Sequence, residues 1–213
     1  MGAGVNTNLH AAGGSPDSAT AVGLDVLARK ARAAGLAPAV SLFYFLRHGE
    51  TAGNAAKTFQ PLDEPLNARG HEQARAAAAI LKDVAFARIT ASDLPRAWLT
   101  AGKVAAATRR AVHAEPLLRE RFFGALIGTP NLGIDWASHP PGGESLDDFV
   151  ARAVSGLMQA TAHGDTPLVV SHGGVLHVLR AGLGLDLTGD FVVNALPLRF
   201  ERRGGRWTVV PVA

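Results

Sequence analysis

Short apolar runs alternate with longer helical segments from residue 41 to the end of the chain. The run at 41–46 (Ser-Leu-Phe-Tyr-Phe-Leu) is almost wholly apolar, which is typical of a strand buried on both faces of a sheet. Further strands are predicted at 87–91, from 112 onwards and at 166–171, and helices at 65–82, 94–108, 144–162 and 174–183. Because strands that alternate with helices favour parallel pairing, the chain is predicted to be α/β, a three-layer α/β/α sandwich with a mostly parallel central sheet.

The two ends of the chain depart from this alternation. Two closing strands at 191–201 and 206–212, joined by a turn at 203–205, predict a mixed edge of the sheet. The domain is expected to cover residues 40–213, with an irregular insertion at 119–143. Residues 1–39 are predicted to be a flexible N-terminal extension with a short helix at 21–34, closed by Gly35. We interpret the extension as dispensable, or as the result of a misassigned start codon, rather than as a transit peptide.

Composition excludes several classes of protein. The chain has no cysteine, which rules out disulfides, thiolate nucleophiles and iron–sulfur clusters. The formal charge of +3 comes from scattered residues, so no nucleic-acid partner is expected, although a site for an anionic substrate would fit. No apolar stretch approaches the roughly 20 residues that cross a bilayer, and no secretory signal is seen at the start. We therefore expect a cytoplasmic protein with no membrane partner; a homodimer is compatible with the sequence, which does not determine the oligomeric state.

Two histidines follow buried strands at equivalent places. Arg47-His48-Gly49 comes directly after the first strand, and Ser171-His172-Gly173-Gly174 comes after a later strand and opens a helix. Ligands of open α/β sheets bind outside the carboxyl ends of the strands, so the two imidazoles would meet if the strands are neighbours. Gly49 and Gly173 would let the backbone approach a ligand, and the N–H groups at the start of the helix favour a phosphate.

These residue types suit phosphoryl transfer. Arg47 and Arg96 would bind the nonbridging oxygens as planar forks, and a neutral imidazole can attack phosphorus at pH 7. Two nearby guanidiniums would help to keep that imidazole unprotonated. The leaving oxygen needs an acid, for which Glu120 is the candidate, with Glu50 and Asp93 as competitors.

A colinear set of short motifs adds a resemblance to a known family. The set consists of Arg47-His48-Gly49-Glu50-Thr51 with Asn54, Gln60 with Asp63 and Pro65-Leu66, Ser92-Asp93-Leu94-Pro95-Arg96-Ala97, Leu118-Arg119-Glu120 with Gly124, Pro141-Gly142-Gly143-Glu144-Ser145, and Val170-Ser171-His172-Gly173-Gly174. Any one of these motifs is weak alone. In this order, over roughly residues 42–213, they resemble the histidine phosphatase (phosphoglycerate mutase-like) superfamily.

The resemblance implies a metal-independent phosphomonoesterase that needs no cofactor and acts on a small phosphate ester. It implies that His48 is the phosphorylated nucleophile, and that Glu120 protonates the leaving group and then activates water. The residues that it implies in phosphate or substrate binding are Arg47, Thr51, Asn54, Gln60, Arg96, His172 and Gly173. The chain departs from the family pattern at 125–128, where a second acid is missing, and at Gln60-Pro61, where Gln-Gly is common; both departures bear on the subgroup.

Other functions stay open at this point. They are a cofactor-dependent phosphoglycerate mutase, a protein phosphohistidine or phosphotyrosine phosphatase, and a non-catalytic module that binds phospho-ligands. Glu120 and His172 are only 52 positions apart. By the resemblance, the mutases carry a longer insertion here that shields the phosphoenzyme from water, so hydrolysis is favoured.

Each candidate residue could also have a purely structural role. The two histidines at the strand ends would then be structural, and Glu120 would be a surface carboxylate paired with Arg119 or Arg121. The remaining histidines, His177 included, are interpreted as solvated or structural. The apolar residues of the insertion fit the mouth of a substrate site and a cap on the core equally well: Phe122, Phe123, Leu126, Ile127 and Trp136.

Overall fold

A computed structural model of the chain describes residues 22–187 and 191–212. Its centre is a six-stranded sheet in the order β3-β2-β4-β1-β5-β6. The four parallel strands are β1 (Leu42–Arg47), β2 (Arg88–Ala91), β3 (Val112–Ala114) and β4 (Pro167–Ser171). The hairpin of β5 (Pro197–Arg203) and β6 (Arg206–Pro211) is antiparallel and forms one edge. The predicted α/β fold with a mixed edge is confirmed.

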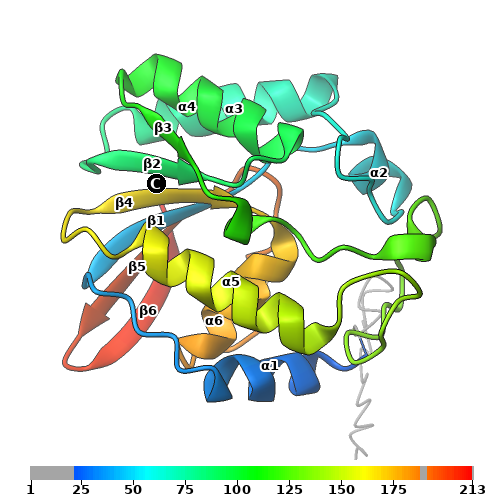
Figure 1. Cartoon of the computed structure of the whole chain (residues 1–213). Helices are drawn as coiled ribbons and strands as arrows, with labels where there is room; N and C mark the ends of the chain where they lie inside the picture. Colours follow the sequence, from blue (N-terminus) through cyan, green and yellow to red (C-terminus); the bar gives the residue numbers. More distant parts are fainter. Residues whose placement is uncertain (1–21, 188–190, 213) are drawn as a thin grey trace, which may run out of the picture.

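Helices cover both faces of the sheet (Figure 1). One layer contains α3 (Ala68–Leu81) and α4 (Pro95–Thr108), and the other contains α1 (Leu24–Ala33), α5 (Leu146–Ala160) and α6 (Gly173–Gly182). Strand β1 explains why there are two layers. Phe43 and Phe45 point into one hydrophobic core, and Tyr44 and Leu46 point into the other, because successive side chains of a strand alternate between faces. No helix of the described part of the chain is both long and apolar enough to span a bilayer.

The helix expected near the N-terminus is α1, and it is packed against the domain. Leu27 and Ala31 have no exposed surface and belong to the same core as Phe43, where α1 lies against α5 and α6. The backbone of Val22 also bridges to the insertion, since the Trp136 N–H donates to its carbonyl. The part of the extension from residue 22 onwards therefore shares the core, whereas residues 1–21 lie outside the described residues. The division at residue 40 stays a prediction.

The closing strand begins later than the sequence suggests. Residues 191–196 form a loop, and only Pro197 starts β5. The loop is held by the carboxyl end of β1: the Ala195 N–H donates to the Arg47 carbonyl, and the Asn194 amide donates to the His48 carbonyl. Residues 191–196 were predicted as strand because they are mostly apolar. Their hydrogen bonds to Arg47 and His48 hold them instead as a loop beside the end of β1.

Three short helices were not predicted, because none is long enough to show a helical period. They are α2 (Ala52–Ala56), η1 (Pro116–Leu118) and η2 (Gly124–Leu126). The first has a capping box, in which the Thr51 hydroxyl accepts from the Asn54 N–H and the Asn54 side chain accepts from the Thr51 N–H. Apart from η1 and η2, the region after Ala114 is irregular up to α5, as expected for the insertion.

Candidate functional site

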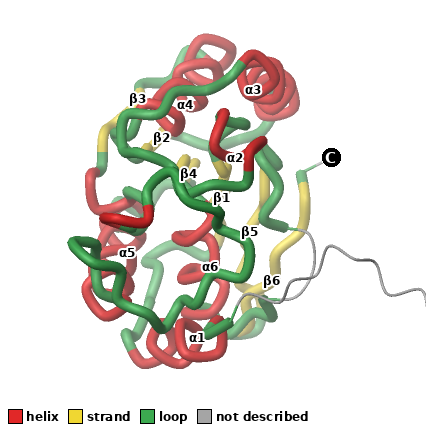
Figure 2. Tube along the Cα trace, turned by 90° about the vertical axis from the view of Figure 1, so that its right-hand side faces the viewer, coloured by secondary structure: helices red, strands yellow, loops and turns green. Residues whose placement is uncertain are grey.

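The site forms where β1 and β4 end side by side. The two strands are parallel neighbours with Arg47 opposite Ser171, so His48 and His172 leave the sheet at the same level. Their ring centroids are 5.1 Å apart. Figure 2 looks at this end of the sheet, with α2 and connecting loops in front of the strands. The meeting of two imidazoles therefore follows from strand order and register.

The imidazole of His48 is oriented by the backbone. Its Nδ1 lies 2.7 Å from the Gly49 carbonyl oxygen. Because a carbonyl only accepts, we assign the proton to Nδ1, which leaves Nε2 with a free lone pair. Burial lowers the pKa of His48 well below its usual value of 6.5, and the charges of Arg47 and Arg96 lower it further. The side chain is thus a neutral imidazole with the electronic form of a nucleophile.

The second imidazole is held by a hydroxyl. His172 has no exposed surface, and its Nε2 lies 2.8 Å from Oγ of Ser92, while its Nδ1 is buried without a hydrogen-bond partner. Burial lowers the pKa of His172 well below 6.5, with Arg96, His48 and Arg47 acting in the same direction. The ring is therefore neutral as well, with one buried nitrogen that makes no hydrogen bond within the described residues.

Two guanidiniums lie beside the imidazoles with unused donors. Arg47 donates from one terminal nitrogen to the Val192 carbonyl at 2.8 Å, and Arg96 donates to the Pro61 carbonyl at 3.0 Å. The Nε of each is buried and has no partner. Burial lowers the pKa of Arg47 to about 10, an effect that the Glu120 carboxylate opposes. Two buried cations with unsatisfied N–H groups are a costly arrangement that an oxyanion would relieve.

Glu120 is fixed by two backbone donors. One carboxylate oxygen accepts from the Arg121 N–H at 2.9 Å, and the other accepts from the Gly174 N–H at 2.9 Å. Of the two charged neighbours proposed as partners, Arg119 is paired with Asp93 instead, and the guanidinium of Arg121 donates to backbone carbonyls. Glu120 therefore faces the cavity and is not part of a surface ion pair.

The competing acids are engaged elsewhere. Asp93 pairs with Arg119, and Glu50 accepts from the Asn67 amide at 3.0 Å, while its own N–H donates to Gln73. Neither carboxylate is among the residues that line the cavity. This agrees with the interpretation that Glu50 fixes the loop after β1.

The other residues implied in substrate binding divide into two groups. Asn54, Gln60 and Gly173 line the cavity, and Oε1 of Gln60 is buried without a partner. Thr51 does not line it; its hydroxyl caps α2 and so orients Asn54.

The need for a glycine at position 49 has a different cause from the one expected. A Cβ at this position would lie 2.4 Å from the carbonyl oxygen of Gly70, so the residue is small because α3 packs against it, not because a ligand does.

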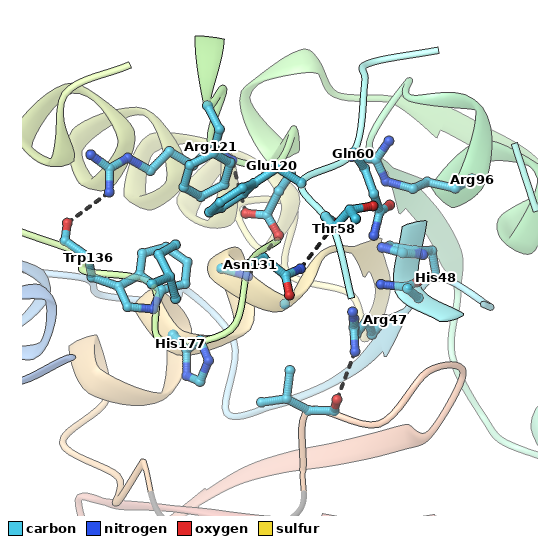
Figure 3. Close-up of a pocket in the computed structure, with 17 residues that line it drawn as sticks. Arg47, His48, Thr58, Gln60, Arg96, Glu120, Arg121, Asn131, Trp136 and His177 are labelled. Carbon is cyan, nitrogen blue, oxygen red and sulfur yellow. Dashed lines mark hydrogen bonds between the residues drawn. The ribbon is translucent and has the colours of Figure 1, made fainter. Parts of the chain in front are cut away.

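A cavity of about 260 Å³ is lined by Arg47, His48, Arg96 and Glu120, and Figure 3 shows their side chains around it. His172 is fully buried beside His48 and is not among the residues that line the cavity. The cavity lining includes Phe123 and Trp136 of the insertion but not Phe122, Leu126 or Ile127. The lining residues that the sequence did not single out for the site are Thr58, Phe59, Arg121, Asn131, Ile134, His177 and Val192. A helical period could have found His177, because it lies three and four residues after Gly174 and Gly173 on one helix face. No sequence signal points to the others.

No cluster of three or more His, Asp or Glu side chains suited to a metal ion occurs within residues 22–187 and 191–212.

Comparison with known proteins was made on both sequence and structure. Residues 43–211 match the model of the histidine phosphatase superfamily (branch 1). A probable phosphoglycerate mutase GpmB from Proteus mirabilis is 35% identical, over 75% of this chain and 78% of the relative. An agropine synthesis reductase from Rhizobium rhizogenes is 34% identical over 81% of this chain and 42% of its own length. The chain likewise spans less than half of the length of other curated relatives that it matches.

Solved structures agree with this assignment. The complex of mycobacterial glucosyl-3-phosphoglycerate phosphatase with VO3 matches with a TM-score of 0.66 and 29% identity, over 80% of this chain and 97% of that chain. The family match includes β1 and β4, with the histidines that follow them, and ends in β6. The chain therefore belongs to the histidine phosphatase superfamily, branch 1.

Proposed function

We propose that the protein is a phosphomonoester hydrolase that works through a phosphohistidine on His48. The observation that carries the proposal is the pairing of a neutral imidazole, whose Nδ1 is bound to a carbonyl, with two buried guanidiniums that have unused donors. An imidazole in this state can attack phosphorus, and the cations can neutralise the phosphoryl oxygens. Family membership supports the same reaction class.

The first step forms the phosphoenzyme. Nε2 of His48 bonds to phosphorus while the ester P–O bond breaks, and Arg47, Arg96 and His172 hold the phosphoryl oxygens. Glu120, in its protonated form, gives its proton to the leaving oxygen, so the alcohol departs neutral and Glu120 is left as the carboxylate that serves in the second step. The carboxylate is suited to this role because two backbone N–H groups aim it into the cavity.

The second step restores the enzyme. A water molecule takes the place of the alcohol, and Glu120 accepts a proton from it as the water oxygen bonds to phosphorus. The P–N bond to His48 breaks, and inorganic phosphate leaves. One residue thus serves as acid and then as base, which is the normal consequence of reversing the same proton transfer.

A phosphoglycerate mutase is the second candidate, since the relative from Proteus mirabilis carries that name. In a mutase the phosphohistidine returns its phosphoryl group to the substrate instead of to water. Hydrolysis is preferred because the insertion before α5 that contributes to the cavity wall is short, and the described residues include no further domain that would exclude water.

The test combines turnover with trapping of the intermediate. Purified protein should release phosphate from p-nitrophenyl phosphate, and His48→Ala should reduce kcat/KM by at least about 10³-fold because the nucleophile is lost. Acid-free quenching with radiolabelled substrate should place the label on His48 and on no other histidine. The exposed His163 supplies a matched control, His163→Ala, which should keep full activity.

Two results would overturn the proposal. If no phosphate is released and His48→Ala changes nothing, the protein is a phospho-ligand binding module. If 3-phosphoglycerate is isomerised without release of phosphate, the mutase is the correct function.

A further inference from the structure

An aromatic wall lies across the cavity from the phosphate end. Four rings follow one another along it: Phe59, Phe123, Trp136 and His177. Neighbouring ring centroids are 4.4, 6.2 and 5.8 Å apart along this series. All four residues line the cavity, and Figure 3 shows Trp136 and His177 together, away from His48 and Arg96. Because the wall has flat apolar faces, it suits a planar or apolar group.

The wall is held rigidly by backbone hydrogen bonds. The Phe59 N–H donates to the Thr129 carbonyl, and the Phe59 carbonyl accepts from the Gly128 N–H. The extended segment before Gln60 is therefore hydrogen-bonded to the insertion. The N–H of Trp136 donates to Val22 at 2.9 Å. These bonds join three distant parts of the chain around one subsite, which is therefore a preformed surface.

Among the described residues that line the cavity, none offers an anionic group a free cation at the aromatic end. The positively charged residues of the lining are Arg47, Arg96 and Arg121. The first two belong to the phosphate end. The guanidinium of Arg121 is used by the carbonyls of Trp136, Ser138 and Glu144, at 2.8, 2.6 and 3.1 Å.

Glu120 is the one acid among the described lining residues. A carboxylate or a second phosphate on the leaving group would lose its hydration in this part of the cavity without gaining a counter-ion from the lining, which is unfavourable.

His177 is the polar feature of the wall. Its ring stands edge-on to Trp136, and its Nδ1 is buried with no hydrogen-bond partner. Burial lowers the pKa of His177 to about 4, and Arg180 and Arg47 lower it in the same direction, so the ring is neutral at pH 7. Because Nδ1 is buried, the nitrogen open to a ligand is Nε2, which can donate to or accept from a hydroxyl group according to the tautomer.

We infer that the aromatic wall is the leaving-group subsite, and that it selects monophosphate esters of uncharged aromatic alcohols carrying a hydroxyl that binds His177. This inference rests on the proposed function, because it names the substrate class of the same site. It also disfavours phosphoglycerates and sugar bisphosphates, whose leaving groups are anionic.

Three esters of one shape test the inference: phenyl phosphate, 4-(hydroxymethyl)phenyl phosphate and 4-carboxyphenyl phosphate. Their phenols differ little in acidity, so differences in kcat/KM report recognition of the para group. The hydroxymethyl ester should exceed the unsubstituted ester by about fivefold to tenfold, which is the effect of one buried hydrogen bond. The carboxylate ester should fall below both by about tenfold or more, because its charge is unpaired.

Variants assign the preference to the wall. His177→Leu should abolish the advantage of the hydroxymethyl ester over phenyl phosphate, while His163→Leu, on the exposed surface, should leave the ratio as it is. His177→Arg should raise kcat/KM for the carboxylate ester relative to the other two. Since the ratio among esters is measured first on the unaltered protein, a variant that fails to fold does not remove the test.

Failure of this inference is distinguishable from failure of the proposed function. The same three esters are bound to His48→Ala and followed by calorimetry, where no turnover is needed. Binding in the predicted order without hydrolysis by the native protein would refute the hydrolase and keep the subsite. Hydrolysis in which the carboxylate ester is equal or preferred, or an unchanged ratio in folded His177→Leu, would refute the subsite alone.

Discussion

The carboxylate of Glu120 accepts a hydrogen bond from the backbone N–H of Gly174, at 2.9 Å, in the first turn of α6. The sequence suggested that this N–H would be free for a phosphate, but it is occupied by the candidate acid. The contact requires a glycine: a Cβ on residue 174 would lie 2.2 Å from Oε1 of Glu120. The helix that follows His172 therefore positions the candidate acid, and in the proposed reaction the phosphate is held by Arg47, Arg96 and His172.

This relationship predicts the effect of Gly174→Ala. The added methyl should push the Glu120 carboxylate out of its position, so kcat for an alkyl phosphate should fall by about 10²-fold. The matched control is Gly102→Ala in α4, where a Cβ meets nothing within 4 Å. That control should keep its activity and gain about 0.5–1 kcal/mol of stability, since alanine favours a helix. Equal activity of the two variants would contradict the assigned role of Gly174.

A second prediction concerns the acid itself. Glu120→Gln keeps the shape of the side chain but can accept only one of the two backbone N–H bonds and cannot donate the proton, so formation of the phosphoenzyme should slow by about 10²–10⁴-fold for an alkyl phosphate. The loss should be much smaller for p-nitrophenyl phosphate, because nitrophenolate leaves without protonation. Pre-steady-state bursts of nitrophenol would separate this step from hydrolysis of the intermediate.

The control for the acid is Glu72→Gln, at an exposed position of α3. It should behave as the native enzyme with both substrates. A loss in Glu120→Gln that is the same for the alkyl and nitrophenyl esters would show that the residue binds substrate and does not supply the proton.

The N-terminal helix yields a third prediction. Leu27 has no exposed surface and sits in the core shared with α5 and α6. Leu27→Ala should therefore lower the free energy of unfolding by about 2–5 kcal/mol. Arg29 lies two positions after Leu27 in the same helix and is exposed, so Arg29→Ala should change the free energy of unfolding by less than about 0.5 kcal/mol. Urea unfolding measures both, and an unaltered stability in Leu27→Ala would mean that the helix is dispensable, as the sequence suggested.

Strand ends were predictable here because polar and glycine residues interrupt each apolar run. His48 follows Leu46-Arg47, and His172 follows a strand in which every residue is buried, so both could be assigned to the carboxyl edge of the sheet. What the sequence left conditional was that β1 and β4 are neighbours, which depends on strand order.

The cavity wall was much less predictable. Phe59 and Trp136 come together through loop backbone bonds to Thr129 and Val22, and such contacts leave no periodic trace in a sequence. The N-terminal helix was predicted as part of a flexible extension, but its Leu27 packs into the core with α5 and α6. The elements could thus be predicted from local sequence patterns, whereas the shape of the cavity depends on long-range packing.

Acid sensitivity provides the last prediction. His177 is neutral in the folded protein down to a pKa of about 4, whereas in the unfolded chain it takes up a proton near 6.5. The unfolded state therefore binds more protons between these values, and stability is lost as the pH falls through this window, by about 3 kcal/mol for this residue. His48 and His172, whose pKa values are also lowered, add to the loss in the same direction. Unfolding free energies at pH 7 and pH 4.5 should thus differ less in His177→Leu than in the native protein, while the exposed His163→Leu keeps the native difference. An equal pH dependence in all three proteins would show that His177 is not held neutral by burial.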